Sequence, residues 1–291
     1  MNEKIEQMKQ HYMDIPIPKE LDFIVNRAIK QNKQRKSNFK WAFATAAAAI
    51  LFVAGINTSS SLAHALSEVP LVGDLVKVLT FREYKFNEGT YKANLEVPAI
   101  TNMDNKTLEE TLNNKYLEEG KKLYSDFTIE MEKLKQNGGG HLGVDSSYVI
   151  KTDNDQILSV GKYVVNTVGS SSTTFKYDTI DKKKQLLITL PSLFKDDAYI
   201  RVISEKIKEQ MKEQMKQDPK KIYWVEGVSN QVNSYFKTIT KDQNFYINAN
   251  GQLVISFQKY EVSPGYMGIV EFIIPTSVLS DILMMKDEYV H

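Results

Sequence analysis

The most distinctive feature of the hydrophobic pattern is a long apolar run near the N-terminus. Residues 41–56 are apolar apart from Thr45, and residues 41–65 contain no Asp, Glu, Lys or Arg. A helix needs about 20 predominantly apolar residues to span a bilayer. We therefore expect one transmembrane helix here, with a weakly polar outer end. A buried helix of a soluble domain is the competing interpretation, but such a helix rarely lacks every charged residue over 25 positions.

The preceding residues, 1–40, carry a helical pattern that prolines divide in two. Pro16 and Pro18 break the first helix, and a second, amphipathic helix runs from about Pro18 to Gln31. Because so short a stretch cannot bury an apolar stripe by itself, we expect it to fold into a partner's groove. The alternative is a solvated tail resting on lipid headgroups. The apolar face that would contact the partner consists of Leu21, Ile24, Val25, Ala28 and Ile29.

Directly after the apolar run, residues 66–83 carry a second amphipathic pattern. Their apolar side chains recur at helical spacing and predict a juxtamembrane helix. Such a helix can lie in the membrane interface, or it can dock on the domain that follows. The residues that set this spacing are Leu71, Val72, Leu75, Val76 and Leu79.

From Tyr84 onward the pattern predicts an α+β domain with an antiparallel sheet. We divide it into a subdomain over 84–190 and a C-terminal subdomain over 191–291. Alternating and apolar stretches predict strands at 84–101, 147–152, 156–168, 174–180 and 185–190. Helical spacing predicts helices over 107–136, 196–217 and 228–238.

The C-terminal part contains the clearest hairpin. Asn250-Gly251 separates two strand patterns, which is the strongest short-range hairpin signal. The chain then turns at 263–266 and returns as a strand over 269–275. A closing helix over 276–285 is expected to bury Val278, Leu279 and Ile282.

Charge sets the orientation of the predicted span. The net charge of +1 conceals a tail of 1–40 with a net charge of +4 and a region of 66–291 with a net charge of −3. Cytoplasmic flanks of membrane helices carry an excess of Lys and Arg. We therefore expect a single-pass protein of the cell membrane, with a cytoplasmic N-terminus and an extracellular C-terminus.

The outer end of the span carries a cleavage pattern. Ala63-His64-Ala65 is an A-x-A sequence, the small-residue pattern that signal peptidase cuts. We expect the cut between Ala65 and Leu66. A secreted protein with an ordinary signal peptide is the competitor, but the region before the apolar run is much longer than a usual n-region.

The sequence offers little for catalysis. There is no cysteine, which excludes disulfides and thiol chemistry, and the four histidines are scattered. No metalloprotease, hydrolase or phosphate-loop motif occurs. We therefore expect neither an enzyme nor a direct nucleic-acid binder, with no catalytic residue, cofactor or metal.

Two segments resemble a known family. The start of the second tail helix is similar to the opening of many anti-sigma factors, at Ile17, Pro18, Glu20, Leu21, Val25 and Ile29. Residues 177–194 and the C-terminal hairpin resemble the lysozyme-responsive anti-sigma-V family. The matching hairpin residues are Gly251, Leu253, Val254, Ile255, Phe257, Tyr260, Glu261, Val262, Pro264, Tyr266 and Gly268.

The resemblance implies a mechanism. The tail would hold an extracytoplasmic-function sigma factor, and the outer domain would bind lysozyme. Signal peptidase would then cut after Ala65, and an intramembrane site-2 protease would cut within 41–56. The ligand loop would consist of Ser263, Pro264, Gly265 and Tyr266. Alternatively, this turn is an ordinary hairpin loop with its tyrosine packed on the sheet.

One loop departs from the family pattern. Where the family often has a Gly-Gly-Ala-His-like loop, this chain has Val168-Gly169-Ser170-Ser171-Ser172. Two other functions stay open at this point. One is a membrane sensor, such as an anti-sigma factor, for another envelope ligand. The other is a secreted or anchored protein that binds or processes the cell wall.

Overall fold

The structure is a computed structural model that describes residues 76–226, 235–285 and 288–291. The predicted sigma-binding helix, transmembrane helix and cleavage site lie in residues 1–75, outside the described part. Within the described part, no helix combines the length and the apolar character that a membrane span requires.

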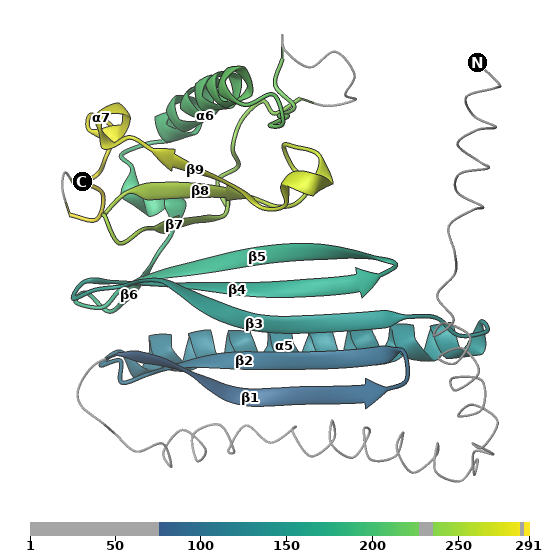
Figure 1. The fold of residues 1–291 in the computed structure, drawn as a ribbon. Helices are drawn as coiled ribbons and strands as arrows, with labels where there is room; N and C mark the ends of the chain where they lie inside the picture. Colours follow the sequence, from purple (N-terminus) through teal and green to yellow (C-terminus); the bar gives the residue numbers. More distant parts are fainter. Residues whose placement is uncertain (1–75, 227–234, 286–287) are drawn as a thin grey trace, which may run out of the picture. The chain divides into compact units, whose positions relative to one another are not determined.

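A six-stranded sheet forms the first half of the described chain (Figure 1). Its strands follow the order of the sequence, and all neighbours are antiparallel except the parallel pair β2–β3. A parallel pair needs a long crossover connection, which helix α5 (Lys106–Gln136) supplies. The strands are β1 (Lys77–Glu88), β2 (Tyr91–Thr101), β3 (Leu142–Asp153), β4 (Ile157–Val168), β5 (Ser170–Asp181) and β6 (Leu186–Ile188).

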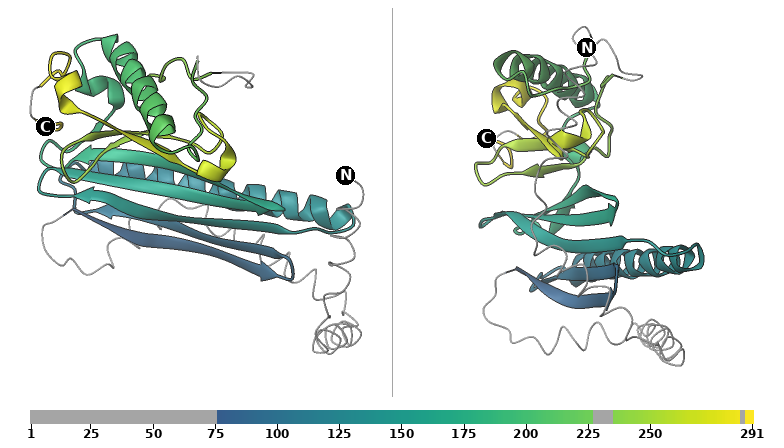
Figure 2. Two further views of the ribbon diagram at one scale, coloured as in Figure 1. Left: turned by 45° about the horizontal axis from the view of Figure 1, so that its top comes forward. Right: turned by 45° about the vertical axis from the view of Figure 1, so that its right-hand side comes forward.

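A three-stranded antiparallel sheet forms the second half. It consists of β7 (Phe245–Ile247), β8 (Leu253–Phe257) and β9 (Val270–Ile274). Helix α6 (Ala198–Gln217) covers one face of this sheet, as both views in Figure 2 show. Its buried side chains, with those of β8 and β9, form the main core, which includes Ile203, Ile207, Met211, Leu253, Ile255, Phe257, Phe272 and Ile274.

Helix α5 and the three-stranded sheet pack on opposite faces of the six-stranded sheet. Lys162 of β4 reaches Glu119 of α5, whereas the Ser159 hydroxyl, three residues earlier, donates to the Ile247 carbonyl of β7 at 3.2 Å. Side chains an odd number of positions apart point to opposite faces of a strand. The Tyr177 and Tyr246 rings, with centroids 4.9 Å apart, extend the contact with β7.

The long helix α5 begins and ends where the sequence predicts. The Asn105 side chain accepts a hydrogen bond from the Leu108 amide at 3.1 Å, which satisfies one free donor of the first turn. Gly138 and Gly139 follow the last turn with φ of +95° and +96°, a region that glycine enters without steric cost.

Asn113 links α5 to β2. Its side-chain oxygen accepts from the Ile100 amide and its NH₂ group donates to the Ile100 carbonyl, each at 2.8 Å, and only 2% of the residue is exposed. Asn113→Ala would leave both main-chain groups buried without partners. We expect the free energy of unfolding to fall by about 2–4 kcal/mol in chemical denaturation. Asn114→Ala, at the exposed neighbouring position, is the control and should change it by less than about 0.5 kcal/mol.

The juxtamembrane helix predicted over 66–83 is wrong from residue 77 onward. Residues 77–83 belong to β1, which pairs with β2 from Lys77↔Thr101 to Glu88↔Tyr91. Val78 and Leu79 suit a strand as well as a helix, and the ladder to β2 decides between the two. Residues 66–75 lie outside the described part.

Two predicted helices of the C-terminal half also need correction. Helix α7 ends at Leu279 rather than at residue 285. Beyond it, the Met284 amide donates to the carbonyl of Leu193, the last residue of the short helix η1 (Leu190–Leu193). The Ile282 carbonyl accepts a hydrogen bond from the Lys195 amide. These long-range bonds replace further helical turns.

Of the helix predicted over 228–238, residues 228–234 lie outside the described part, and 235–238 are not helical. The Phe236 amide donates to the Trp224 carbonyl at 2.8 Å instead. A tertiary main-chain bond therefore takes the place of a helical one.

Candidate functional site

The loop between β8 and β9, residues 258–269, is the most prominent aromatic surface among the described residues. Tyr260 is 59% exposed and Tyr266 is 66% exposed, although most large apolar and aromatic side chains of this half are buried. A single helical turn, η2 (Gly265–Met267), presents Tyr266. Exposed tyrosines on a structured loop are typical of protein-binding surfaces.

Tyr260 and Gly265 fix the shape of this loop. A Cβ atom at residue 265 would lie 2.2 Å from the Tyr260 ring, so only glycine allows the ring to lie against the main chain here. Tyr260 itself has φ of +68°, a left-handed conformation that costs a non-glycine residue about 1 kcal/mol or more. Local strain of this kind is common where a loop has a binding role.

Residues 220–224 hold the loop around Tyr266 through three hydrogen bonds. The Tyr266 hydroxyl donates to the Lys220 carbonyl at 2.7 Å, and the Ile222 amide donates to the Met267 sulphur at 3.3 Å. The Trp224 amide donates to the Val262 carbonyl at 2.8 Å. The exposed ring is therefore anchored at its far end before any ligand arrives.

The four predicted ligand residues divide into two kinds. Pro264 and Gly265 are partly exposed, and Tyr266 is exposed. Ser263 is 0% exposed, and its hydroxyl has no hydrogen-bond partner among the described residues. Ser263 therefore lies beneath the loop, and its side chain offers no surface to a ligand in this conformation.

The turn at 168–172 lies beside the same loop. The Lys259 ammonium donates to the Ser171 carbonyl at 2.6 Å. Lys259 also lies 5.2 Å from the centre of the Tyr260 ring. Residues almost ninety positions apart thus share one surface, and nothing in the local sequence pattern indicates this contact.

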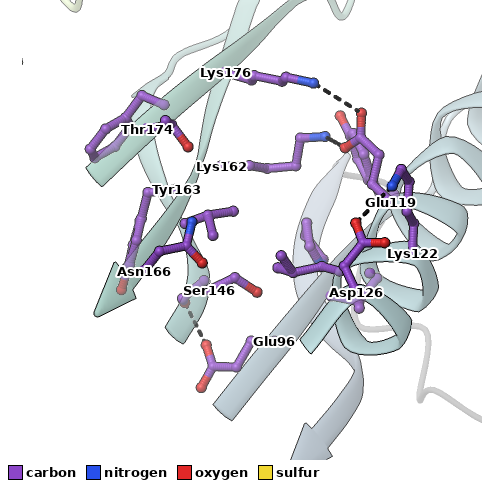
Figure 3. A pocket seen from close by; sticks show the side chains of 18 residues that line it. Glu96, Glu119, Lys122, Asp126, Ser146, Lys162, Tyr163, Asn166, Thr174 and Lys176 are labelled. Carbon is purple, nitrogen blue, oxygen red and sulfur yellow. Dashed lines mark hydrogen bonds and ion pairs between the residues drawn. The ribbon is translucent and has the colours of Figure 1, made fainter. Parts of the chain in front are cut away.

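A second concave region lies between α5 and strands β2 to β5. Its cavity volume is about 330 Å³, and its apolar lining includes Val97, Leu123 and Val164. Figure 3 shows the Lys162 and Lys176 ammonium groups pointing at Glu119, and Lys122 pointing at Asp126. The charges are therefore paired with one another around the rim.

Lys162 is the most buried of these charges, with 12% of its side chain exposed. Burial lowers the pKa of its ammonium group, while the carboxylates of Asp178 and Glu119 act to raise it. This arrangement is a charge network that ties α5 to the sheet. The described residues contain no group of three or more His, Cys, Asp or Glu side chains that could hold a metal ion.

The C-terminal half matches a family model. Residues 191–277 match the family "Protein of unknown function (DUF3298)". A crystal structure of a DUF3298 member from Bacteroides fragilis aligns with 72% of this chain and 94% of its own, at 14% identity and a TM-score of 0.49. A second, from Pseudomonas aeruginosa, covers the same shares at 10% identity and a TM-score of 0.46.

The sequence as a whole is similar to that of the Anti-sigma-V factor RsiV of Bacillus subtilis. The two chains are 45% identical over 285 residues, which is 98% of each. The chain therefore belongs to the anti-sigma-V factor family, as the sequence resemblance indicated.

Proposed function

We propose that this protein is a membrane-anchored anti-sigma factor that an extracellular protein ligand inactivates. It would hold an extracytoplasmic-function sigma factor in the cytoplasm and release it by regulated intramembrane proteolysis after binding lysozyme. The observation that carries the proposal is the 45% identity to an anti-sigma-V factor along 98% of both chains. So long a match includes most of the tail and the apolar run as well as the outer domain.

The tail supplies the sigma-binding surface in this proposal. The apolar stripe of Leu21, Ile24, Val25, Ala28 and Ile29 would lie in a groove of the sigma factor. The uncharged residues 41–65 would hold this tail at the inner membrane surface, with the outer domain on the other side.

The outer domain supplies the lysozyme-binding surface. Pro264, Gly265 and Tyr266 form a short, supported turn, so little conformational entropy is lost when the tyrosine enters a cleft. The net charge of −3 over 66–291 also favours a cationic ligand such as lysozyme, although only modestly.

Cleavage then connects the two sides. Only residues 66–76 separate the predicted cut after Ala65 from the start of β1 at Lys77. Even fully extended, eleven residues span about 36–40 Å, so a folded domain stays close to the bond that signal peptidase must reach. We propose that lysozyme binding exposes this bond and that the site-2 protease then cuts within 41–56.

The test follows cleavage of the full-length chain in cells, by immunoblotting, with and without added lysozyme. We expect lysozyme to convert the wild-type chain to a shorter form and to leave Ala65→Trp intact, because the peptidase accepts only small residues at this position. Catalytically inactive lysozyme separates direct binding from wall damage and should act like the active enzyme. A wild-type chain that stays intact with both forms would refute regulated cleavage by lysozyme.

A further inference from the structure

Strand β5 has an edge that other strands leave uncovered. On one side it pairs with β4 along its whole length, from Ile157↔Asp181 to Val168↔Ser170. On the other side, β6 covers only Thr179 to Asp181. In an antiparallel strand, the main-chain groups of alternate residues point to the same side. The amides of Tyr177 and Phe175 bond to side chains on the side away from β4. The main-chain N–H and C=O groups of the next alternate residues, Thr173 and Ser171, therefore also point to this open edge.

Two amide side chains occupy the first part of this edge in the place of a strand. The Asn244 side chain accepts from the Tyr177 amide at 3.0 Å and donates to the Phe175 carbonyl at 3.0 Å. The Gln258 side chain accepts from the Phe175 amide at 2.9 Å and donates to the same carbonyl at 2.5 Å. Both side chains carry a carboxamide, the same chemical group as a peptide bond. This edge is thus already saturated by peptide-like groups as far as Phe175.

The next two positions are open. Among the described residues, nothing bonds to the Thr173 amide, the Thr173 carbonyl or the Ser171 amide, and only the Lys259 ammonium reaches the Ser171 carbonyl. Lys259 lies at the surface on a flexible stem, so an incoming N–H group can replace it. A lysine at this place is also a common guard against accidental strand pairing.

The open positions adjoin the predicted ligand loop. Gln258 and Lys259, which contact β5, directly precede Tyr260 in the 258–269 loop. A ligand that contacts Tyr260 therefore comes close to Ser171, the carbonyl of which Lys259 reaches. Donors and acceptors that alternate at strand spacing match an extended polypeptide, whereas a sugar or an anion would match neither the spacing nor the alternation.

We propose that the β5 edge at Ser171–Thr173 is a strand-addition site, which takes an extended segment of the protein ligand as a new neighbour of β5. The proposal rests on the proposed function, in that the outer domain binds a protein, and it specifies how part of that protein is held. Main-chain hydrogen bonds would then add affinity to the aromatic contacts of the loop and fix the orientation of the ligand.

Two variants of the full-length chain test the proposal, with lysozyme as the ligand. Thr173→Pro removes an amide that points away from β4, so the ladder between β4 and β5 keeps its bonds. We expect it to weaken binding at least tenfold. Thr173→Ala keeps the amide and should bind within threefold of the wild type.

Hydrogen exchange on the wild-type chain gives a readout that does not depend on the folding of a variant. On lysozyme binding, the Ser171 and Thr173 amides should exchange at least tenfold more slowly. The Thr174 amide, which points toward β4, should stay unchanged. If exchange at Ser171 and Thr173 is unaffected in the complex, strand addition is refuted even though binding itself stands. If the wild-type chain fails to bind lysozyme, the proposed ligand and the strand addition fall together.

Discussion

Tyr266→Ala is expected to weaken lysozyme binding by the full-length chain by about 30- to 1,000-fold. This range corresponds to about 2–4 kcal/mol, as for an aromatic residue at the centre of a binding surface. The ring is 66% exposed and its hydroxyl is held on the Lys220 carbonyl, so it is available and oriented before binding. Isothermal titration calorimetry would give the dissociation constant.

Tyr266→Phe is the matched control. It keeps the ring and removes only the hydroxyl that donates to Lys220, so we expect a loss of no more than about tenfold. The melting temperature of both variants should stay close to that of the wild type, since the side chain adds little to the core. Binding by Tyr266→Ala at wild-type strength would move the ligand surface away from this loop.

Phe257→Ala is expected to lower the free energy of unfolding by about 3–5 kcal/mol, the usual cost of truncating a buried phenylalanine. Phe257 is 1% exposed and packs edge-on against two rings, with centroid distances of 5.3 Å to Phe236 and 5.8 Å to Phe272. No neighbour can fill the resulting space without leaving its own contacts. Urea denaturation monitored by circular dichroism would measure the loss.

Val168→Ala serves as the comparison for Phe257→Ala. Val168 is also a strand residue, but it is 57% exposed. Its truncation should change the free energy of unfolding by less than about 0.5 kcal/mol. A loss below about 1 kcal/mol for Phe257→Ala would mean that β8 does not form the centre of this core.

The periodicity of apolar residues was sufficient to predict the strand β8 and the helices α5 and α6, where the spacing fits only one kind of element. Alternation at Leu253, Ile255 and Phe257 predicted a strand with these side chains on one face, and all three lie in the main core. The opposite face of β8 is buried as well, at Val254 and Ser256. The residues of α5 and α6 carry helical spacing over many turns, and their predicted bounds are nearly right. The turn at Gly251 could also be predicted from the local sequence, because its φ of +69° is a conformation that glycine adopts without steric cost.

The failures come from long-range hydrogen bonds. Residues 77–83 fit a helix or a strand equally well by spacing, and the choice depends on β2, which no local pattern reveals. The parallel pairing of β2 with β3, across the whole of α5, is equally invisible in the sequence. Helix α7 stops early because the main chain that follows it, at Ile282 and Met284, bonds to Lys195 and Leu193.

The same distinction applies to the candidate site. The resemblance to the anti-sigma-V family points to Pro264 and Tyr266, because these residues belong to a contiguous motif. It could not show that the Tyr260 ring packs on Gly265, or that Ser263 faces inward. Nor could it show that Gln258 reaches β5, since that contact joins residues 83 positions apart.

The last residues of the printed chain contribute to the core of the three-stranded sheet, although β9 ends at Ile274. Val290 is 1% exposed in the same core as β8, and the His291 amide donates to the Gly251 carbonyl at 2.9 Å. Deletion of residues 288–291 would therefore uncover apolar side chains of this core and remove a main-chain bond from the turn at Gly251.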